Sequence, residues 1–144
     1  MDLPQVGGRQ GVEMSAVEKN GSASVASTKD GPDFTADWGH LTWLVGEQEM
    51  PGSEQTFGVV TIYPGKRNAL HSHPNCEELL FVMSGECDHL LGDEVIPLSP
   101  GSVIRIPRGV RHWAHCTSEE PLRAVISFSS PDRRTDNHED GSVA

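Results

Sequence analysis

The residues with the clearest chemical potential lie near the middle of the chain, where His71 and His73 are followed by Glu78. A further histidine, His112, comes after the turn sequence Pro107-Arg108-Gly109. In a β-strand, residues two apart point to the same face, so His71 and His73 can direct both imidazoles into one interior. Glu78 and His112 each open a later apolar run, from which their side chains can reach the same interior.

Three imidazoles and one carboxylate suit a divalent first-row metal ion, such as iron, manganese, zinc, nickel or cobalt. Four protein ligands around an octahedral ion leave two positions for water, a substrate or oxygen, as in catalytic rather than closed structural sites. We therefore predict one divalent metal ion held by His71, His73, Glu78 and His112. Glu78 is also the candidate catalytic residue, because a carboxylate that detaches from the ion can accept a proton.

The remaining histidines fit a metal site less well. His115 lies three residues after His112, so strand alternation places it on the opposite face of the sheet. His89 lies outside the ligand pattern, and His40 and His138 lie near the ends of the chain. We expect these last three to be ordinary polar residues.

The cysteines Cys76, Cys87 and Cys116 form no C-x-x-C pair, and their odd number argues against a disulfide scaffold or a structural zinc site. We expect free thiols in a reducing compartment. The reactivity of Cys76 and Cys116 stays open, because both lie beside histidines in the sequence. Cys116 shares the strand parity of His112, which leaves a thiol ligand as a weaker alternative.

The elements that must position these residues are short apolar runs, separated by turns such as Ser84-Gly85 and Pro100-Gly101. Such spacing predicts an antiparallel β-sandwich or barrel, and no stretch among these runs shows helical periodicity. The expected strands are Leu41–Val45, Phe57–Tyr63, Glu78–Met83, Asp88–Leu91, Glu94–Leu98, Ser102–Ile106, His112–Cys116 and Leu122–Phe128.

The two ends of the chain differ in composition from this middle part. Residues 1–35 are poor in aromatic residues, and we expect a flexible leader with at most a short helix over residues 12–19. Residues 131–144 are also polar, which predicts a loose tail. The barrel would then occupy residues 36–130, as the one domain of a chain of 144 residues.

Charge and hydropathy argue against several kinds of partner. The formal net charge of −10 should repel nucleic acids and anionic membranes, and no basic stripe offsets it. The sequence has no apolar run of about 18 residues that could span a membrane, and its N-terminus lacks the layout of a secretory signal. We therefore expect a cytoplasmic protein that binds a small molecule, and neither nucleic acid nor a membrane.

The glycines around the candidate ligands complete a pattern that resembles the two signature motifs of the cupin superfamily, over roughly residues 40–130. The motifs here read Gly65-x5-His71-Ser72-His73-x4-Glu78-x6-Gly85 and Gly101-x5-Pro107-Arg108-Gly109-x2-His112. The resemblance implies a small single-domain cupin with an all-β fold, a jelly-roll barrel or double-stranded β-helix. It also implies that His71, His73, Glu78 and His112 are the metal ligands.

Two positions compete with or depart from the family pattern. Glu77 is a rival for the carboxylate ligand, but the distance from Glu78 to Gly85 fits the first motif. The second motif usually ends in asparagine, whereas this chain has Cys116. We expect the ligands to be kept and the local hydrogen bonding to differ.

Strand parity also predicts the walls of the barrel interior. Leu80, Val82 and Ala114 share the parity of the candidate ligands on their strands and should line the interior. Arg105 and Arg123 are expected to extend from the outer face of the sheet, although they would suit an anionic substrate if they faced inward. The aromatic residues expected in the core or at an interface are Trp43, Phe57, Tyr63 and Phe128.

The resemblance implies a metal-dependent enzyme acting on a small oxygenated organic molecule, through isomerase, cyclase, lyase or dioxygenase chemistry. Such a substrate would chelate the metal through carbonyl, hydroxyl or carboxylate oxygens. The alternative is a non-catalytic small-molecule-binding or sensing cupin. Cupins of this kind are commonly homodimers, and we expect a homodimer here, with residues 40–46 adding to the sheet edge of a second copy.

Overall fold

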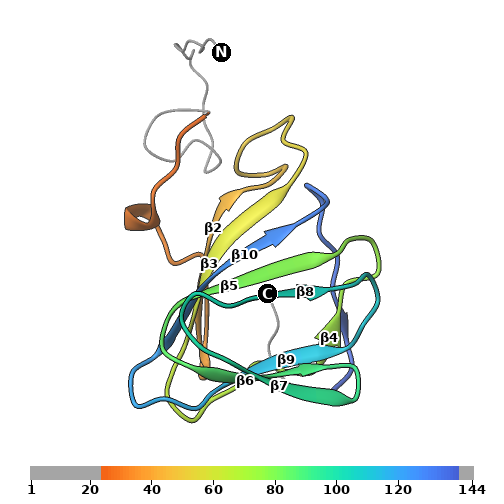
Figure 1. Cartoon of the computed structure of the whole chain (residues 1–144). Coiled ribbons are helices and arrows are strands. Elements are labelled where there is room, and N and C mark those ends of the chain that lie inside the picture. Colours follow the sequence, from red (N-terminus) through yellow and green to blue (C-terminus); the bar gives the residue numbers. More distant parts are fainter. Residues whose placement is uncertain (1–23, 140–144) are drawn as a thin grey trace.

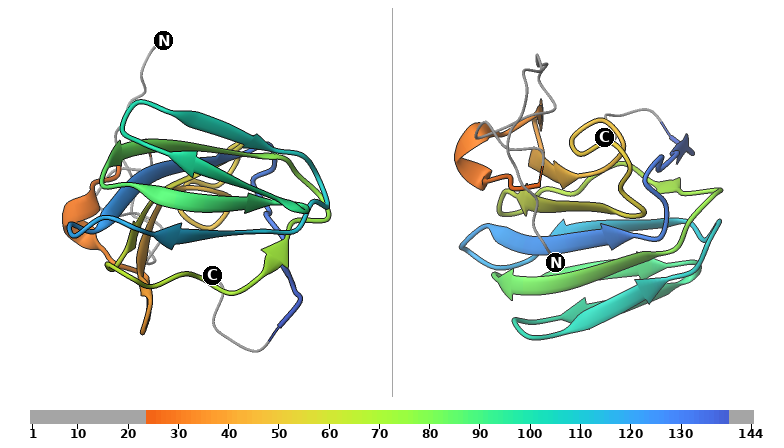
Figure 2. Two further views of the ribbon diagram at one scale, coloured as in Figure 1. Left: turned by 60° about the horizontal axis from the view of Figure 1, so that its bottom comes forward. Right: turned by 90° about the horizontal axis from the view of Figure 1, so that it is seen from above.

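Two antiparallel β-sheets face each other in the computed structural model, which describes residues 24–139 (Figure 1). One sheet has six strands in the order β1-β2-β3-β10-β5-β8, and the other has five in the order β11-β4-β9-β6-β7. Seen from above, the strands of the six-stranded sheet lie side by side (Figure 2). The bounds are β1 Phe34–Ala36, β2 Gly39–Val45, β3 Thr56–Ile62, β4 His71–Ser72, β5 Glu78–Ser84, β6 Cys87–Leu91, β7 Glu94–Leu98, β8 Val103–Ile106, β9 His112–Cys116, β10 Leu122–Phe128 and β11 Asp136–Asn137.

This arrangement confirms the predicted all-β jelly-roll barrel. Each predicted strand has a counterpart whose bounds differ by at most two residues, the largest difference being the earlier start of β2 at Gly39. The helical element among the described residues is the short 3₁₀ turn η2, Thr28–Asp30. Within residues 24–139, no helix has the length and apolar character needed to cross a membrane.

Side-chain alternation explains why the strands form two layers. In β5, Glu78, Leu80 and Val82 are buried between the sheets, whereas Leu79 and Phe81 point outward and are exposed. Burial of one face of each strand removes apolar surface from water, at roughly 25 cal/mol per Å². The core between the sheets includes Leu41, Val60, Ile62, Ile104, Ile106, Leu122, Ala124 and Ile126.

Two turns next to the site require glycine. Gly85 has a φ of +76°, and a side chain there would collide with the Pro121 carbonyl. Gly109, with a φ of +80°, lies in the turn before β9, and its N–H donates to the His73 carbonyl oxygen at 2.9 Å. Both φ angles lie in the left-handed region that favours glycine. The turn that precedes His112 is thereby tied to the segment that carries His73.

Segments on both sides of the predicted barrel contact it. β1 pairs with β2, and β11 pairs with β4, where Asp136 lies opposite Ser72 and Asn137 opposite His71. Residues 131–139 belong to the predicted polar tail, yet they lie against β4, and we call them the C-terminal strap. The remainder of the predicted leader and tail, including the helix over residues 12–19, lies outside the described residues.

The edge of β2 over residues 40–46, which was predicted to add to a second copy, is partly covered within the chain. β1 pairs with residues 39–41. Beyond it, the Trp43 N–H donates to the Asp33 carboxylate at 2.6 Å. The covering segment is anchored by the Phe34 ring, whose centroid lies 6.1 Å from that of the buried Trp38.

Candidate metal centre

The three predicted histidine ligands converge at the interior face of the five-stranded sheet. His71 in β4 lies directly opposite His112, the first residue of β9, and His73 follows β4. Their ring centroids are 4.2 to 5.2 Å apart. One nitrogen from each ring lies within 4.8 Å of the other two, and all three side chains are buried.

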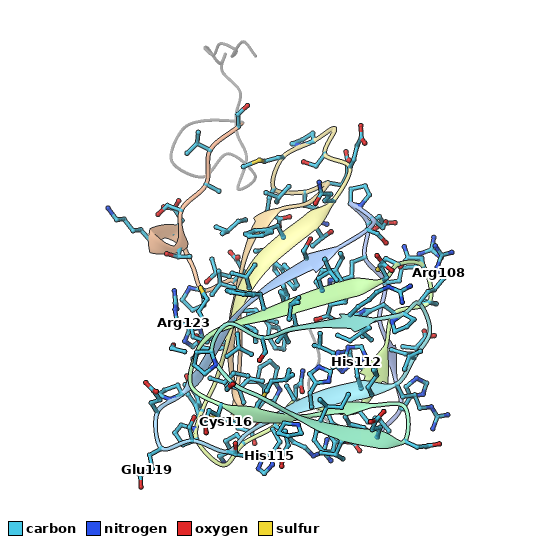
Figure 3. The ribbon with its side chains drawn as sticks, in the orientation of Figure 1. Arg108, His112, His115, Cys116, Glu119 and Arg123 are labelled. Atoms are coloured by element: carbon cyan, nitrogen blue, oxygen red, sulfur yellow. The ribbon has the colours of Figure 1, made fainter. Side chains whose placement is uncertain are left out.

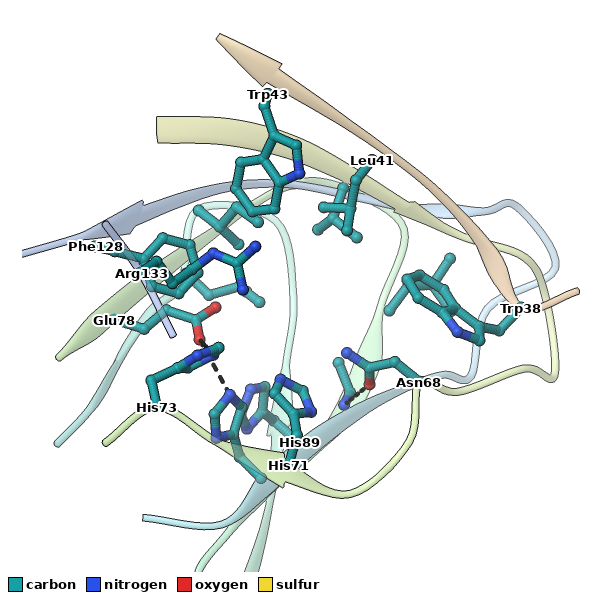
Figure 4. Close-up of a pocket in the computed structure, with 16 residues that line it drawn as sticks. Trp38, Leu41, Trp43, Asn68, His71, His73, Glu78, His89, Phe128 and Arg133 are labelled. Atoms are coloured by element: carbon teal, nitrogen blue, oxygen red, sulfur yellow. Dashed lines mark hydrogen bonds and ion pairs between the residues drawn. The ribbon is translucent and has the colours of Figure 1, made fainter. Parts of the chain in front are cut away.

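Glu78 reaches the same point from the opposite sheet, where it is the first residue of β5. Its Oε1 lies 3.0 Å from His112 Nε2 and 3.3 Å from His73 Nε2 (Figure 4). The rival carboxylate, Glu77, instead faces outward and forms an ion pair with Arg105 at 2.8 Å. The structure therefore brings Glu78 into the histidine cluster and leaves Glu77 outside it.

The other ring nitrogen of each histidine is engaged by a main-chain carbonyl. His71 Nδ1 lies 2.7 Å from the Ala69 oxygen, and His112 Nδ1 lies 2.9 Å from the Val110 oxygen. His73 Nδ1 lies 2.8 Å from the Arg134 oxygen. A carbonyl can only accept, so each Nδ1 carries the hydrogen and, in the neutral ring, each Nε2 keeps its lone pair for a metal.

These contacts create a cluster of electron-pair donors that needs a cation. Burial raises the pKa of Glu78, but the hydrogen bonds with His112 and His73 outweigh it and hold that pKa well below its usual range. Burial lowers the pKa of His112, yet the hydrogen bond with Glu78 outweighs it and raises that pKa. A proton on His112 balances one carboxylate only. A divalent ion would serve all four donors, so the residues present fit the predicted metal.

His71 has the electrostatic character expected of a neutral ligand. Burial, followed by the proximity of His112, lowers the pKa of His71 to about 3. The ring is therefore uncharged at neutral pH. A metal binding to it would displace no proton from its free nitrogen.

A cavity of about 50 Å³ adjoins this cluster (Figure 4). Because about 10 to 15 Å³ of such space admits one water molecule, the cavity has room for a small ligand. The predicted wall residues Leu80 and Ala114 line it, and Val82 is buried in the core beyond it. Further walls come from Trp38, Leu41, Trp43, Val60, Ile62, Asn68, His89, Ile126, Phe128 and Arg133.

The prediction that His89 is an ordinary polar residue is wrong. This side chain is fully buried, lines the cavity and stacks on His112, with ring centroids 5.8 Å apart and planes inclined by 8°. Burial lowers its pKa to about 4, so the ring is neutral. The signal was present in the alternation of β6, where Cys87 and His89 are buried and Asp88 is less so.

Asn68 and Arg133 also line the cavity, but the sequence did not predict them as site residues. Asn68 Oδ1 accepts a hydrogen bond from the Ala114 N–H at 2.9 Å, which joins the loop before β4 to β9. Arg133 belongs to the C-terminal strap, where composition alone predicted a loose tail. No strand alternation marks either position, because both lie in segments without regular structure.

The remaining candidates lie away from the cavity. His115 projects from the outer face of β9 while His112 projects inward, as predicted (Figure 3). Cys116 is buried, but its Sγ lies 3.4 Å from the Glu120 carbonyl oxygen, so the structure does not place the thiol in the ligand cluster. His138 Nε2 lies 2.8 Å from Ser72 Oγ, in the strap.

The three cysteines are free and buried, as expected. Burial raises the pKa of Cys76 and raises that of Cys87 to about 12. A thiol with a raised pKa is a poor nucleophile at neutral pH. Neither residue therefore adds a reactive group to the site.

Comparison with known proteins relates this geometry to a family. The family model described as the cupin domain matches residues 58–128, which carry all four predicted ligands. Among curated proteins, protein SchB of Streptomyces halstedii is 34% identical over 104 residues, covering 72% of this chain and 75% of SchB. Polyketide synthase CurC of Streptomyces cyaneus is 29% identical over 91 residues, covering 63% of this chain and 59% of CurC.

Solved structures show the same fold. Oxalate decarboxylase of Lactobacillus farciminis, in a formate complex, superposes with a TM-score of 0.69 at 21% sequence identity. The match covers 75% of this chain but 33% of the decarboxylase chain. This chain thus corresponds to about a third of that larger protein, and the likeness extends to the barrel.

Proposed function

This chain belongs to the cupin superfamily, and we propose that it is a metal-dependent enzyme acting on a small oxygenated organic molecule. The reaction class would be that of an isomerase, cyclase, lyase or dioxygenase. The observation that carries the proposal is the convergence of three histidine Nε2 atoms and the Glu78 carboxylate beside a cavity. The name of CurC adds support, because polyketides are oxygenated molecules with several carbonyl groups.

His71, His73, Glu78 and His112 would hold one divalent transition-metal ion. When bound, such an ion supplies Lewis-acid polarisation of a substrate oxygen or, if redox-active, reaction with dioxygen. The protein contributes the remainder. The carbonyl contacts orient the imidazoles, the aromatic walls exclude water, and Glu78 can accept a proton at its carboxylate oxygen.

Metal analysis of the purified protein tests the ligand set. We expect close to one equivalent of a transition metal in the wild type and a loss of that metal in His112→Ala. The matched control is His115→Ala, which removes a histidine from the same strand on the outer face and should keep the full metal content. A His112→Ala variant that retains the metal contradicts the proposal.

The non-catalytic alternative predicts the same metal content but no turnover. Cobalt-loaded protein can be incubated with a panel of hydroxyketones, 1,3-dicarbonyl compounds and catechols, and followed by proton NMR. Metal-dependent conversion of one class supports the enzyme. Broadening of ligand signals without conversion of any class supports a binding or sensing cupin.

We also propose that the chain forms a homodimer through the outer face of β5 and β8. Phe81 and Val103 lie opposite each other on these strands and are 43% and 60% exposed, beside the exposed Leu79 and Met83. Adjacent exposed apolar side chains favour an interface. Glu77 and Arg105 at its margin carry opposite charges. A second copy would therefore meet less electrostatic repulsion at this face than at other faces of a chain whose net charge is −10.

Light scattering tests this interface. Phe81→Asp should reduce the mass from that of two chains to that of one. Val95→Asp is the control, because Val95 is a comparably exposed apolar residue, at 50%, on β7 of the other sheet. A wild-type protein with the mass of one chain contradicts the proposed dimer.

A further inference from the structure

Arg133 is the one arginine or lysine among the described residues that line the metal-site cavity. It comes from the C-terminal strap, and its guanidinium projects into the space beside the Glu78 carboxylate (Figure 4). The predicted ligand set and the proposed function make no use of it. A half-buried cation beside the predicted ligands calls for a separate explanation.

Aromatic faces and a hydrogen bond hold this guanidinium in place. Its Cζ lies 4.4 Å from the ring centroid of Trp43 and 5.2 Å from that of Phe128. Its Nη1 donates to Thr135 Oγ1 at 2.7 Å. Because the planar group is already oriented, little further side-chain entropy is lost when it binds a ligand. A guanidinium has five N–H donors, so one group can serve several acceptors at once.

The balance of charge in the cavity depends on this arginine. Glu78 is the one carboxylate among the described lining residues, and Glu49, outside this lining, also acts electrostatically on Arg133. A divalent ion bound by the predicted ligands would therefore leave the cavity lining with a net positive charge. Uncompensated buried charge is costly, so the loaded cavity should favour a negatively charged ligand.

We propose that Arg133 makes this cavity a binding site for a small anionic ligand, with a carboxylate or ionised hydroxyl on the guanidinium and a second oxygen on the metal. This inference rests on the proposed function, because the second contact needs the ion. Guanidinium suits a carboxylate because two parallel N–H groups can bind its two oxygens. A neutral ligand of the same shape would leave the excess charge in place.

Glycolate and glycolamide form a matched pair of probes, because both are small hydroxy compounds and only glycolate carries a charge. Isothermal calorimetry on cobalt-loaded protein measures both affinities in the wild type, Arg133→Met, Arg133→Lys and Arg134→Met. Arg134 is the matched control, because it is an exposed neighbour whose substitution removes the same charge. Its main-chain carbonyl, which bonds to His73, remains.

We expect the wild type to bind glycolate at least about tenfold more tightly than glycolamide, as charge-assisted hydrogen bonds do. Arg133→Met should lower this preference several-fold while keeping its cobalt content and its affinity for glycolamide. Arg134→Met should behave as the wild type, and Arg133→Lys should restore part of the preference. A purely structural role for Arg133 would weaken both probes equally.

The possible failures are distinguishable. If cobalt-loaded Arg133→Met keeps the wild-type preference for glycolate, the anion site is wrong and the proposed function stands. If the wild type takes up no cobalt, the proposed function is contradicted and the anion site with it. If Arg133→Met loses its cobalt, the affinities of Arg133→Lys for the two probes decide whether Arg133 acts through its charge. A preference retained in Arg133→Lys supports the charge role, and a preference lost there overturns it.

Discussion

The two sides of the metal-site cavity are supported in different ways. On the barrel side, His71 and His112 are each oriented by the carbonyl two residues earlier, from Ala69 and Val110. On the strap side, His73 is oriented by the Arg134 carbonyl, 61 residues away in the sequence. The barrel side is therefore built from local contacts in the matched cupin region, whereas the strap side needs a segment beyond residue 128.

The strap is fastened to the loop that carries the ligands. Asn75 Nδ2 donates to the Asp132 carbonyl at 2.8 Å, and Asn75 Oδ1 accepts from the Arg134 N–H at 3.0 Å. Near the other end, the Glu139 carboxylate accepts from the Leu70 N–H at 3.1 Å. The ring orientation of one ligand, His73, therefore depends on a long-range contact, whereas those of His71 and His112 depend on local ones.

Removal of a metal ligand should have the largest effect on metal retention. The effect should be equal for a histidine of the barrel side and for one of the strap side. His71→Ala and His73→Ala each leave three donors, so both should lose the metal completely on dialysis against a weak chelator. Metal analysis after dialysis measures this, with circular dichroism to confirm that the barrel is folded. Full retention of metal by either variant would show that the lost histidine is not a ligand.

The buried His89 on the barrel side should make the metal-free protein sensitive to acid. Its folded-state pKa of about 4 lies below the ordinary 6.5, so the unfolded chain binds the extra proton and stability falls as pH drops through this window. His89→Leu should remove about 3 kcal/mol of this loss. Urea unfolding with chelator present, from pH 7 to pH 4, measures it.

A control on the strap side sharpens the same experiment. His138→Leu removes an exposed histidine and should leave the acid dependence of unfolding unchanged. Equal acid sensitivity of the wild type and His89→Leu would contradict the assignment of the effect to burial of His89.

A chain that ends at Ser130 should lose the strap but keep the barrel. His73 would lose the carbonyl that holds its ring, and loss of such an outer contact typically weakens metal binding about 10- to 100-fold. Competition with a chromophoric chelator measures the affinity. An affinity equal to that of the full chain would show that the strap does not support His73.

Asn75→Ala should have the smallest effect of the series. It removes both side-chain bonds to the strap and leaves β11 and Glu139 in place, so we expect a loss of affinity of a few-fold. The same competition assay measures it, with Asn137→Ala as the control because Asn137 is an exposed residue of the strap. A loss as large as that of the truncated chain would mean that Asn75 alone fastens the strap.

The sequence predicted the direction of a side chain correctly where side chains alternate with the period of a β-strand. Parity placed His71, His112 and Leu80 inward and His115 outward, and the structure agrees. The same alternation places His89 inward on β6, as it places His112 inward on β9. The spacing to Gly85 in the first motif further identified Glu78, and not its neighbour Glu77, as the candidate ligand.

Contacts of the strap could not be predicted in this way. Residues 131–139 have few apolar side chains, and their polarity alone indicated a loose tail. What orders them is hydrogen bonding to the loop around Asn75 and pairing of β11 with β4. Such partners have no fixed spacing in the sequence. Arg133 was missed for the same reason, since its neighbours Trp43 and Phe128 come from distant strands.

The contact between His73 and residue 134 uses a main-chain oxygen, and this has a consequence for variation in the sequence. Any amino acid at position 134 supplies the same carbonyl, so exchanging that side chain costs the site nothing. A one-residue insertion between Ser130 and Arg133 would move a different carbonyl into place and shift the guanidinium away from the Trp43 and Phe128 rings. The strap is therefore constrained in length at a position where its composition is free.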